Sequence, residues 1–511
     1  MKVCLVSPLL QHIYLLGDIS AKYPPLGLGY IASVLEKGGH EVKIIERKLF
    51  VNFSSNRQQY LREADRKTKD ELLSFNPDIV GITSTTPAVM DAFRVAKIVK
   101  SLNGKILTII GGAHPSITAE HTLSQCTDID IACKGEGEFV MLEVANGVDY
   151  RQIKGISYRN GSGIISNECR ESFDDLDKMP YPARHLFDTG FYFSEDVAVM
   201  RGTMMRAATI FTARGCPFKC AFCLSTHLAQ LTSGKYVRFH SPEYIANEIE
   251  FLIDKYGINA VNILDDMFAV SKKRAASICE TFIKRGLHKR IKYNVNLRAD
   301  SVDEDLLRIL KRSGCINVVY GCESGSEHAL KLMKKNTTVA KNMEAIEATK
   351  KAGITCDVNI LIGMPGETED DIANTIRFLK KSRPDKIRVS KLYPLPGTAV
   401  FADLFGAGII RKDYDNWDEI GERYDINDVT FSDMPYSRFL YLWNRLNREI
   451  VLPTNYMFAF RANFNHSKMY AIRNCILMLL HVSFLYLPLG IQGYIKKLAE
   501  KLSYKLRFLF R

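Results

Sequence analysis

Three cysteines lie within eight residues in the segment F-T-A-R-G-C-P-F-K-C-A-F-C, which covers positions 211–223. A structural zinc ion normally takes four protein ligands, commonly from paired C-x2-C motifs, and no second pair is near this one. A thioredoxin-type redox site needs only two thiols. An iron–sulfur cube held by three thiolates leaves one iron open for another ligand. The spacing therefore predicts that Cys216, Cys220 and Cys223 bind a [4Fe–4S] cluster with one iron left for other chemistry.

The elements that position these cysteines form a repeat of strands and helices after residue 206. The expected strands are Ala207–Ala213, Ala260–Leu264, Lys292–Asn296, Asn317–Tyr320, Thr355–Ile362 and Lys386–Ser390. The helical patterns are Pro242–Tyr256, Lys272–Arg285, Asp303–Ser313, Glu327–Met333, Val339–Ala352 and Asp370–Ser382. Six such units predict a partial, TIM-like (β/α)6 barrel, whose site lies at the carboxyl ends of the strands. The three cysteines follow the first strand directly.

The first 146 residues show a similar alternation. Apolar runs suited to strands are Val3–Pro8, Glu41–Ile45, Asp78–Thr83, Lys105–Gly111 and Ile129–Lys134. The helical stretches between them are Leu26–Lys37, 57–74, Ala88–Leu102 and Ile117–Ser124. This order predicts an α/β fold with a doubly wound, Rossmann-like parallel sheet. The motif G-x-G-x-x-G does not follow the first strand, which disfavours a dinucleotide site.

Small and polar residues stand at the carboxyl ends of these strands, where such sheets bind ligands. Glycines there allow the backbone to approach a broad ligand closely. Each cluster alone fits an ordinary turn. Four clusters on one rim favour a ligand platform instead. The candidate binding residues are Gly27, Ser84, Thr85, Gly112 and His114.

Composition limits the class of protein. The chain has 511 residues, enough for two to four domains, with 46% hydrophobic and 25% charged residues, which excludes disorder on a large scale. Its 12 cysteines are irregularly spaced and no secretory signal precedes the first strand, so we expect a cytoplasmic protein with reduced thiols. The net charge of +12 suits an anionic partner. No dedicated nucleic-acid-binding appendage is visible, so nucleic acid is not expected.

The loop C-P-F-K-C-A-F-C resembles the signature of radical S-adenosylmethionine (SAM) enzymes. Further similar motifs are N-L-R at 296–298, G-C-E-S-G at 321–325, G-M-P-G-E-T at 363–368 and Y-P-L-P-G-T at 393–398. With the N-terminal P-P-L-G-L-G-Y and G-G-A-H-P segments, this layout is similar to radical SAM proteins that carry an N-terminal cobalamin (vitamin B12)-binding domain. The resemblance implies three cofactors, namely the cluster, SAM on its open iron, and cobalamin.

The resemblance also implies roles for individual residues. The three cysteines bind the cluster, and Phe222 offers its backbone to the adenine of SAM. Glu323 and Ser324 reach the ribose or the methionyl end of SAM, with a salt bridge or a helix cap as the alternative. Arg298 pairs with the SAM carboxylate, because a guanidinium fork matches a carboxylate. The alternative for Arg298 is an ion pair inside the barrel.

The sequence departs from the family pattern at two places. Many members carry G-G-E after the second strand, whereas this chain reads L-D-D-M-F at 264–268. Asp265 or Asp266 is expected to contact the amino group of SAM instead, or to cap a helix. The D-x-H-x-x-G motif, which supplies a histidine beneath cobalt in other cobalamin proteins, is absent. This absence leaves open an N-terminal domain that binds nothing.

Five segments are expected along the chain. A hairpin-like pair and the turn M-P-Y-P mark a junction between the two α/β units. The segments are a cobalamin-binding-like domain at 1–146, a linker at 147–205, a radical SAM core at 206–400, a helical region at 401–470 and an apolar and basic tail at 471–511.

The tail predicts contact with a membrane surface. Its apolar run at 475–491 is shorter than the ~20 residues that span a bilayer. A basic amphipathic stretch follows at 492–511, a combination typical of helices on anionic membranes. The alternative is a helix packed on the protein's own core. Membrane contact favours a lipid-like or other apolar substrate, because radical hydrogen abstraction acts on carbons without acidic protons.

The leading functional prediction is a cobalamin-dependent radical SAM enzyme that methylates an unactivated carbon. It would act on a small-molecule or lipid-like substrate and take electrons from a donor such as flavodoxin or ferredoxin. One alternative is a radical cyclase or another enzyme that changes a carbon skeleton. The other is a non-catalytic, membrane-associated iron–sulfur sensor or electron carrier. A carrier favours four thiolates, so the three-cysteine loop speaks against it.

Overall fold

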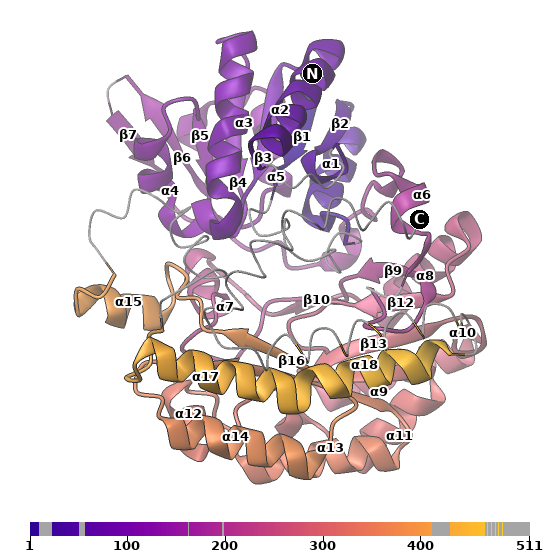
Figure 1. Cartoon of the computed structure of the whole chain (residues 1–511). Coiled ribbons are helices and arrows are strands. Elements are labelled where there is room, and N and C mark those ends of the chain that lie inside the picture. Colours follow the sequence, from indigo (N-terminus) through magenta and orange to yellow (C-terminus); the bar gives the residue numbers. More distant parts are fainter. Residues whose placement is uncertain are drawn as a thin grey trace.

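The computed structural model describes residues 1–9, 23–50, 57–161, 163–196, 199–410 and 430–464, and single positions at 468, 472, 476, 479 and 483. Within these residues two α/β units lie one above the other (Figure 1). Two C-terminal helices run across the front of the lower unit in that view. The predicted α/β fold with two parallel sheets and a helical C-terminal region is confirmed.

The N-terminal unit is a seven-stranded sheet in the order β2-β1-β3-β4-β5-β6-β7. Its five parallel strands are β1 Lys2–Ser7, β2 Glu41–Glu46, β3 Ile79–Thr83, β4 Leu107–Gly111 and β5 Ile131–Cys133. Apolar side chains pack on both faces of this sheet, which explains the continuous apolar runs in the sequence. The strand order reverses between β1 and β3, and open α/β sheets bind ligands at such a switch point.

Five helices cover this sheet. They are α1 Leu26–Lys37, α2 Arg57–Phe75, α3 Val89–Leu102, α4 Ala113–Gln125 and α5 Glu138–Ala145. Helix α4 begins four residues before the predicted start, because Gly112 turns the chain at a φ of +103° directly from β4 into the helix. A Cβ at Gly112 would lie 2.6 Å from the carbonyl oxygen of Ser84, so this position requires glycine.

The segment expected as a linker belongs partly to the first sheet. Its hairpin, β6 Ile156–Asn160 and β7 Gly163–Ser166, extends the sheet in antiparallel fashion beyond β5. Further along, Arg184 donates a hydrogen bond of 3.0 Å to the carbonyl of Thr209 and forms an ion pair of 2.8 Å with Glu248. Both partners of this ion pair are buried, so the junction is firmly packed against the second unit.

The second unit is an open sheet in the order β16-β15-β14-β13-β12-β9-β8. Its six parallel strands, as predicted, are β9 Met205–Ile210, β12 Ala260–Ile263, β13 Lys292–Leu297, β14 Cys315–Glu323, β15 Thr355–Ile362 and β16 Lys386–Lys391. The short strand β8, Glu195–Asp196, adds an antiparallel edge. Because β8 and β16 are not paired with each other, the barrel is partial.

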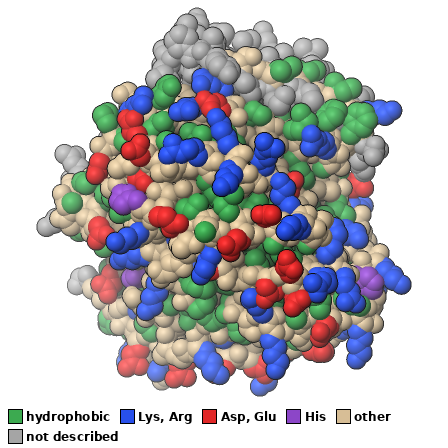
Figure 2. Space-filling model, turned by 90° about the horizontal axis from the view of Figure 1, so that it is seen from below, with side chains coloured by type: hydrophobic (Ala, Val, Ile, Leu, Met, Phe, Trp, Pro, Cys, Tyr) green, Lys and Arg blue, Asp and Glu red, His purple; other side chains and the backbone are tan. Residues whose placement is uncertain are grey.

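Helices pack on the outer face of this sheet and bury the main apolar core of the chain. They are α8 Pro242–Tyr256, α9 Lys272–Lys284, α10 Leu287–Arg290, α11 Glu304–Arg312, α12 Glu327–Leu332, α13 Val339–Lys351 and α14 Glu369–Ser382. All except α10 begin after a Ser, Thr or Asp whose side chain accepts a hydrogen bond from the first turn. Figure 2 shows the molecule from below, where cationic and anionic side chains are mixed over the surface.

The described part of the C-terminal region is helical, as predicted. Its helices are α15 Ala399–Gly406, α17 Tyr436–Leu446 and α18 Leu452–Asn463, with a π-helical turn at Asn447–Val451 between the last two. Helix α18 lies along the free edge of β16. The Asn455 amide accepts a hydrogen bond from Ile387 N–H at 2.8 Å and donates one to the Ile387 carbonyl at 2.7 Å. One side chain therefore pairs with the strand as a neighbouring strand would.

Most of the predicted tail, 471–511, lies outside the described residues. At the described positions Ile472, Ile476 and Leu479 are 54%, 54% and 62% exposed. Among the helices within the described ranges, none has the length and apolar character needed to cross a bilayer. Attachment of the tail to a membrane surface stays a prediction.

Candidate active site

The cysteine loop connects strand β10, Ala213–Arg214, to helix α7, Ser225–Leu228. Its middle is held by backbone hydrogen bonds of Ala221. The N–H of Ala221 donates to the carbonyl of Met333 at 2.9 Å, and its carbonyl accepts from the N–H of Val400 at 3.2 Å. These partners follow β14 and β16, so the loop is fixed near the carboxyl ends of the barrel strands, where the sequence placed it.

The three thiols lie close enough to influence one another. Burial raises the pKa of Cys216, and the nearby Asp266 and Cys220 raise it further. The pKa of Cys223 rises to about 11 for the same reasons, burial first. In the described part of the chain, no three His, Cys, Asp or Glu side chains are arranged to hold a single metal ion. In a [4Fe–4S] cluster each thiolate would bind its own iron, so the three thiols need not converge on one ion.

Charged side chains of both signs surround the thiols. Asp266 follows β12, and its carboxylate raises the pKa of Cys216 and Cys223. Lys335 lies near Cys216 and Cys220 and forms an ion pair of 3.0 Å with Glu323. Glu323 has a φ of +63°, an uncommon conformation for a residue with a side chain. Glu323 thus forms the salt bridge that was the alternative to a SAM contact, and its contact with SAM stays a prediction.

Arg298 supports the cysteine loop from below. Its guanidinium carbon lies 3.8 Å from the centroid of the Phe218 ring. It also makes two hydrogen bonds with Asp300, of 3.0 and 2.7 Å, and one of 2.8 Å with the Lys335 carbonyl. One terminal nitrogen of the buried guanidinium has no partner among the described residues. Arg298 thus forms the ion pair inside the barrel, with Asp300, that was the alternative to a SAM contact. The nitrogen without a partner could still bind a ligand carboxylate.

Asp265 holds the backbone just before the cysteine loop, and its contact with SAM stays a prediction. Its carboxylate is fully buried and accepts hydrogen bonds from the N–H groups of Thr212 and Ala213, at 2.6 and 3.1 Å, and from the Thr212 hydroxyl. Burial raises the pKa of Asp265 to about 6 despite these bonds. The neighbouring Asp266 faces the thiols, so the acidic residue next to the cluster loop is the second of the pair.

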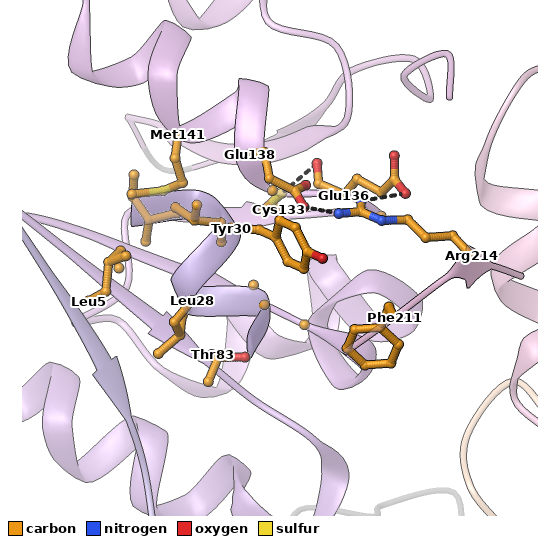
Figure 3. A pocket seen from close by; sticks show the side chains of 18 of the residues that line it. Leu5, Leu28, Tyr30, Thr83, Cys133, Glu136, Glu138, Met141, Phe211 and Arg214 are labelled. Atoms are coloured by element: carbon orange, nitrogen blue, oxygen red, sulfur yellow. Dashed lines mark hydrogen bonds and ion pairs between the residues drawn. The ribbon is translucent and has the colours of Figure 1, made fainter. Parts of the chain in front are cut away.

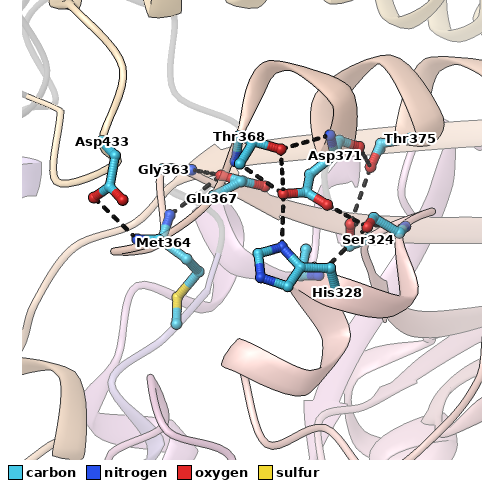
Figure 4. A network of polar contacts seen from close by, with 12 residues as sticks. Ser324, His328, Gly363, Met364, Glu367, Thr368, Asp371, Thr375 and Asp433 are labelled. Carbon is cyan, nitrogen blue, oxygen red and sulfur yellow. Dashed lines mark hydrogen bonds and ion pairs between the residues drawn. The ribbon is translucent and has the colours of Figure 1, made fainter.

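Ser324 is hydrogen-bonded within the protein, and its contact with SAM stays a prediction. Its buried hydroxyl hydrogen-bonds with the Thr375 hydroxyl at 3.0 Å and accepts from the Ser326 N–H at 3.1 Å. This places Ser324 in a polar network that joins the end of β14 to α14 (Figure 4). Phe222 is partly buried and packs in an apolar cluster with Leu361 and Met364. That packing fixes the backbone around Phe222, and its contact with adenine stays a prediction.

The same network contains Glu367 of the G-M-P-G-E motif (Figure 4). Its fully buried carboxylate accepts hydrogen bonds from the N–H groups of Gly363 and Met364 and so closes the turn after β15. The second carboxylate oxygen has no partner among the described residues. Burial raises the pKa of Glu367 to about 7.

A cavity of about 360 Å³ opens between the two units (Figure 3). Its apolar wall comes from the N-terminal sheet and its helices, and includes Leu5, Leu28 and Met141. At the other end it reaches Gly215 and Asp266 beside the cysteine loop. The cavity thus connects the ligand edge of the N-terminal sheet with the predicted cluster site, and its volume lies in the range of small-molecule sites.

The glycines of the predicted platform fit a broad ligand at this edge. A Cβ added to Gly27 would meet nothing within 4 Å, so the wall is open there. Gly27 and Gly112 line the cavity, and their contact with a ligand stays a prediction. Ser84, Thr85 and His114 are not among its lining residues. His114 is buried with its Nδ1 3.1 Å from the Thr86 hydroxyl, and burial lowers its pKa to about 3, so it is neutral.

Four charged side chains tie the two units together at the mouth of this cavity. Arg214 pairs with Glu136 at 2.8 Å and with Glu138 at 2.7 Å (Figure 3). Arg238 pairs with Glu136 at 2.6 Å. Although burial opposes ionisation, the two arginines hold the pKa of Glu136 at about 2. The G-E-G-E segment at 135–138 lines the cavity, and its two glutamates also bind the strand that precedes the cysteine loop.

The inner wall of the barrel carries a row of polar side chains that the sequence analysis did not single out. Thr209, Asn262, Asn294 and Asn317 are neighbours in register on β9, β12, β13 and β14. Each is at most 3% exposed, and each has at least one side-chain polar atom without a partner among the described residues. The sequence does contain a signal for this row, because polar and apolar residues alternate along these strands. Buried amides without partners are suited to a ligand that supplies hydrogen bonds.

The fold and the site together define a class of enzymes. In this class a partial barrel carries a three-cysteine loop for an iron–sulfur cluster, and a sheet of the cobalamin-binding type precedes the barrel. The chain matches the model of the radical SAM superfamily over residues 210–379 and that of the B12 binding domain over residues 14–145. It belongs to the radical SAM superfamily and carries a B12 binding domain. The expected cofactors, a [4Fe–4S] cluster, SAM and cobalamin, are those of these two domains. The prediction of an enzyme is therefore confirmed, and the alternative of a non-catalytic electron carrier is not supported.

Similar proteins align with most of the chain. An uncharacterized methyltransferase of Pyrococcus horikoshii is 32% identical over 405 residues, which cover 78% of this chain and 82% of the relative. An anaerobic magnesium-protoporphyrin IX monomethyl ester cyclase of Cereibacter sphaeroides is 27% identical over 76% of this chain and 61% of its own length. The solved structure of the radical SAM methyltransferase TsrM from Kitasatospora setae, with cobalamin and a [4Fe-4S] cluster bound, has a TM-score of 0.62 at 18% identity, covering 80% of this chain and 75% of that one. This likeness supports the fold.

Proposed function

We propose that this protein is a cobalamin-dependent radical SAM methyltransferase that adds a methyl group to an unactivated carbon. The observation that carries this proposal is the cavity that runs from Gly27 and Gly112 of the N-terminal unit to Gly215 and Asp266 beside the cysteine loop. Such a connection brings a ligand of the B12 binding domain next to the site where SAM would be cleaved. Its 32% identity to a methyltransferase favours methylation over ring closure.

When bound, the cluster with SAM supplies a radical that abstracts hydrogen, and cobalamin supplies a methyl group. The residues of this chain position these groups. Cys216, Cys220 and Cys223 hold the cluster, and the available nitrogen of Arg298 pairs with the SAM carboxylate. Asp266 lies beside the thiols and offers an acceptor to the SAM amino group.

The inner wall of the barrel favours a substrate with hydrogen-bonding groups. A wholly apolar molecule would leave the buried amides of Asn294 and Asn317 without partners, at a cost of about 1–3 kcal/mol for each unsatisfied group. The lipid-like substrate predicted from the tail is therefore proposed only in the form of a molecule that also carries a polar part. Attachment to a membrane surface through 471–511 is part of the same proposal, supported by the exposed Ile472, Ile476 and Leu479.

Anaerobic reconstitution with iron, sulfide and cobalamin tests the function. Cell extract from a strain lacking the protein serves as the source of substrate, with SAM labelled in its methyl group. We expect S-adenosylhomocysteine and 5′-deoxyadenosine to form together, and the label to enter a product that still contains polar groups. Formation of 5′-deoxyadenosine without S-adenosylhomocysteine would reject methylation and favour ring closure.

A further inference from the structure

A second hollow, with a volume of about 560 Å³, lies against the cysteine loop. All of its lining residues lie between Cys216 and Val237, so it is formed by the loop, helix α7 and the segment that follows. It shares no lining residue with the cavity between the two units. Gly215 lines the cavity, whereas Cys216, the next residue, lines this groove. The cysteine loop therefore separates the two spaces.

The groove is cationic. The sequence contains no Asp or Glu from Arg214 to Pro242. Lys219 and Lys235 line the groove and are exposed, and the described residues provide neither with an ion pair. Arg214 and Arg238 of the same segment are neutralised by glutamates of the N-terminal unit. The mixed surface of Figure 2 contrasts with this local excess of positive charge.

An acidic side chain does border the groove. Glu171 lies beside Ser233 through an isolated bridge, on a segment that approaches from the N-terminal unit. Its carboxylate is exposed and is not among the groove's lining residues. Among the residues that line the groove, two are lysines and none is an Asp or Glu.

The groove also provides a short path to the cluster. Cys216 is a predicted ligand of the cluster and at the same time part of the groove wall. Pro217 is exposed next to it, and Phe218 lies partly buried over Arg298. A protein seated in the groove would thus contact the loop at an apolar patch and be separated from the cluster by one thiolate side chain.

We propose that this groove is the docking site of a small acidic one-electron carrier protein, of the flavodoxin or ferredoxin kind. The inference rests on the proposed function, because cleavage of SAM consumes one electron each time. The carrier is oxidised by one electron and the cluster is reduced by one. With cluster and SAM bound, that electron would be the one consumed when the carbon–sulfur bond of SAM is cleaved to methionine and a 5′-deoxyadenosyl radical.

The size and charge of the groove suit such a partner. Electron-transfer complexes are weak and bury little surface, so a local groove is sufficient. Positive charge without paired acids steers an acidic carrier to the loop and raises the rate of encounter, an effect that salt screens. The opposite side of the loop faces the cavity, whose wall comes largely from the N-terminal unit, so the groove is the side of the loop that lies outside that cavity.

The test compares two electron donors on the reconstituted full-length enzyme. The variant is Lys219→Glu with Lys235→Glu. The matched control is Lys273→Glu with Lys289→Glu, which makes the same charge change at exposed lysines outside the groove. Formation of 5′-deoxyadenosine is measured with reduced flavodoxin and, separately, with dithionite. Iron content and the visible spectrum verify that each variant has assembled its cluster. Because Lys219 is next to Cys220, the single variant Lys235→Glu is also measured, since it leaves the cysteine loop unchanged.

We expect the groove variant to lose at least tenfold in the flavodoxin-driven rate at low salt and to keep the dithionite-driven rate within twofold. The control should keep both rates, and rising salt should slow only the enzyme with intact lysines. Equal losses with both donors would overturn the proposal and place the groove in the active site, for example as a site for a small anion. Unchanged rates with both donors would place docking elsewhere.

Direct binding separates this inference from the proposed function. The affinity of flavodoxin is measured by calorimetry on the reconstituted wild-type and variant proteins without SAM. An affinity at least tenfold weaker for the groove variant alone supports docking, even if no SAM is cleaved with any donor. Equal affinity for all proteins overturns it. Absence of dithionite-driven SAM cleavage in the wild type would count against the proposed function instead.

Discussion

The substitution Glu367→Gln tests whether burial of the Glu367 carboxyl makes the stability of the protein depend on pH. The Glu367 side chain is fully buried, closes the turn after β15, and has one oxygen without a partner among the described residues. Burial raises its pKa from 4.5 to about 7. A raised pKa means that the neutral acid stabilises the fold below about pH 4.5, and that this stability is lost as pH rises through about 7.

The expected magnitude follows from the two pKa values. A difference of roughly 2.5 units at about 1.4 kcal/mol per unit gives about 3.5 kcal/mol, of which about 2.5 kcal/mol is lost between pH 5 and pH 8.5. Glutamine keeps an acceptor for the Gly363 and Met364 N–H groups and cannot ionise. Glu367→Gln should therefore be less stable than or similar to wild type at pH 5 and more stable at pH 8.5.

Urea unfolding of the apoprotein at several pH values measures this difference. Asp370→Asn, the same chemical change at an exposed carboxylate in the first turn of α14, is the control and should follow the wild-type pH dependence. The reasoning is refuted if the free-energy difference between wild type and Glu367→Gln is the same at pH 5 and pH 8.5. It is also refuted if the control shows the larger pH effect.

Three further changes test the site. Asp265→Asn should lower the free energy of unfolding by about 2–4 kcal/mol, seen in urea titration, because an amide nitrogen would face donors that the carboxylate now accepts. Asp266→Asn should change stability by less than about 1 kcal/mol and slow SAM cleavage, and the reverse pattern would contradict the assignment of the two residues. Glu136→Gln should cost about 2–3 kcal/mol at pH 7 and speed proteolysis between the two units, because Arg214 loses a partly buried anionic partner. Cys223→Ser should lower the iron content and abolish 5′-deoxyadenosine formation, and retention of a full cluster would contradict its role as a ligand.

Strands and helices of the two units could be predicted because each is encoded locally. The apolar runs of β1 and β15 and the Ser, Thr and Asp caps of the outer helices are readable in a window of a few residues. Helix α4 was placed too late because the turn at Gly112 depends on a contact with Ser84, which belongs to the preceding strand–helix connection. The hairpin of β6 and β7 could be predicted from the sequence. Its pairing with β5 in the first sheet could not, because strand pairing depends on residues far apart in the chain.

The candidate site was harder to predict at the level of side chains. Asp265 and Asp266 are adjacent in the sequence, and only the direction in which the chain leaves β12 decides which of them faces the thiols. Ser324 follows a recognised motif, but its hydroxyl is used by Thr375 of a later helix. The binding of Glu136 to Arg214 joins residues 78 positions apart and depends on how the two units pack. Such contacts follow from tertiary structure and have no local signal.

The pairing of Asn455 with Ile387 has a consequence for how this architecture can diversify. A closed barrel would fix the width of its lumen through further strands, each bonded to the next along its whole length. Here the last strand is completed by a single amide on a helix, so the lateral wall of the chamber can be exchanged by changing one helix. We expect proteins built on this plan to vary substrate through the segment from α17 to α18, while the sheet and its cysteine loop stay the same.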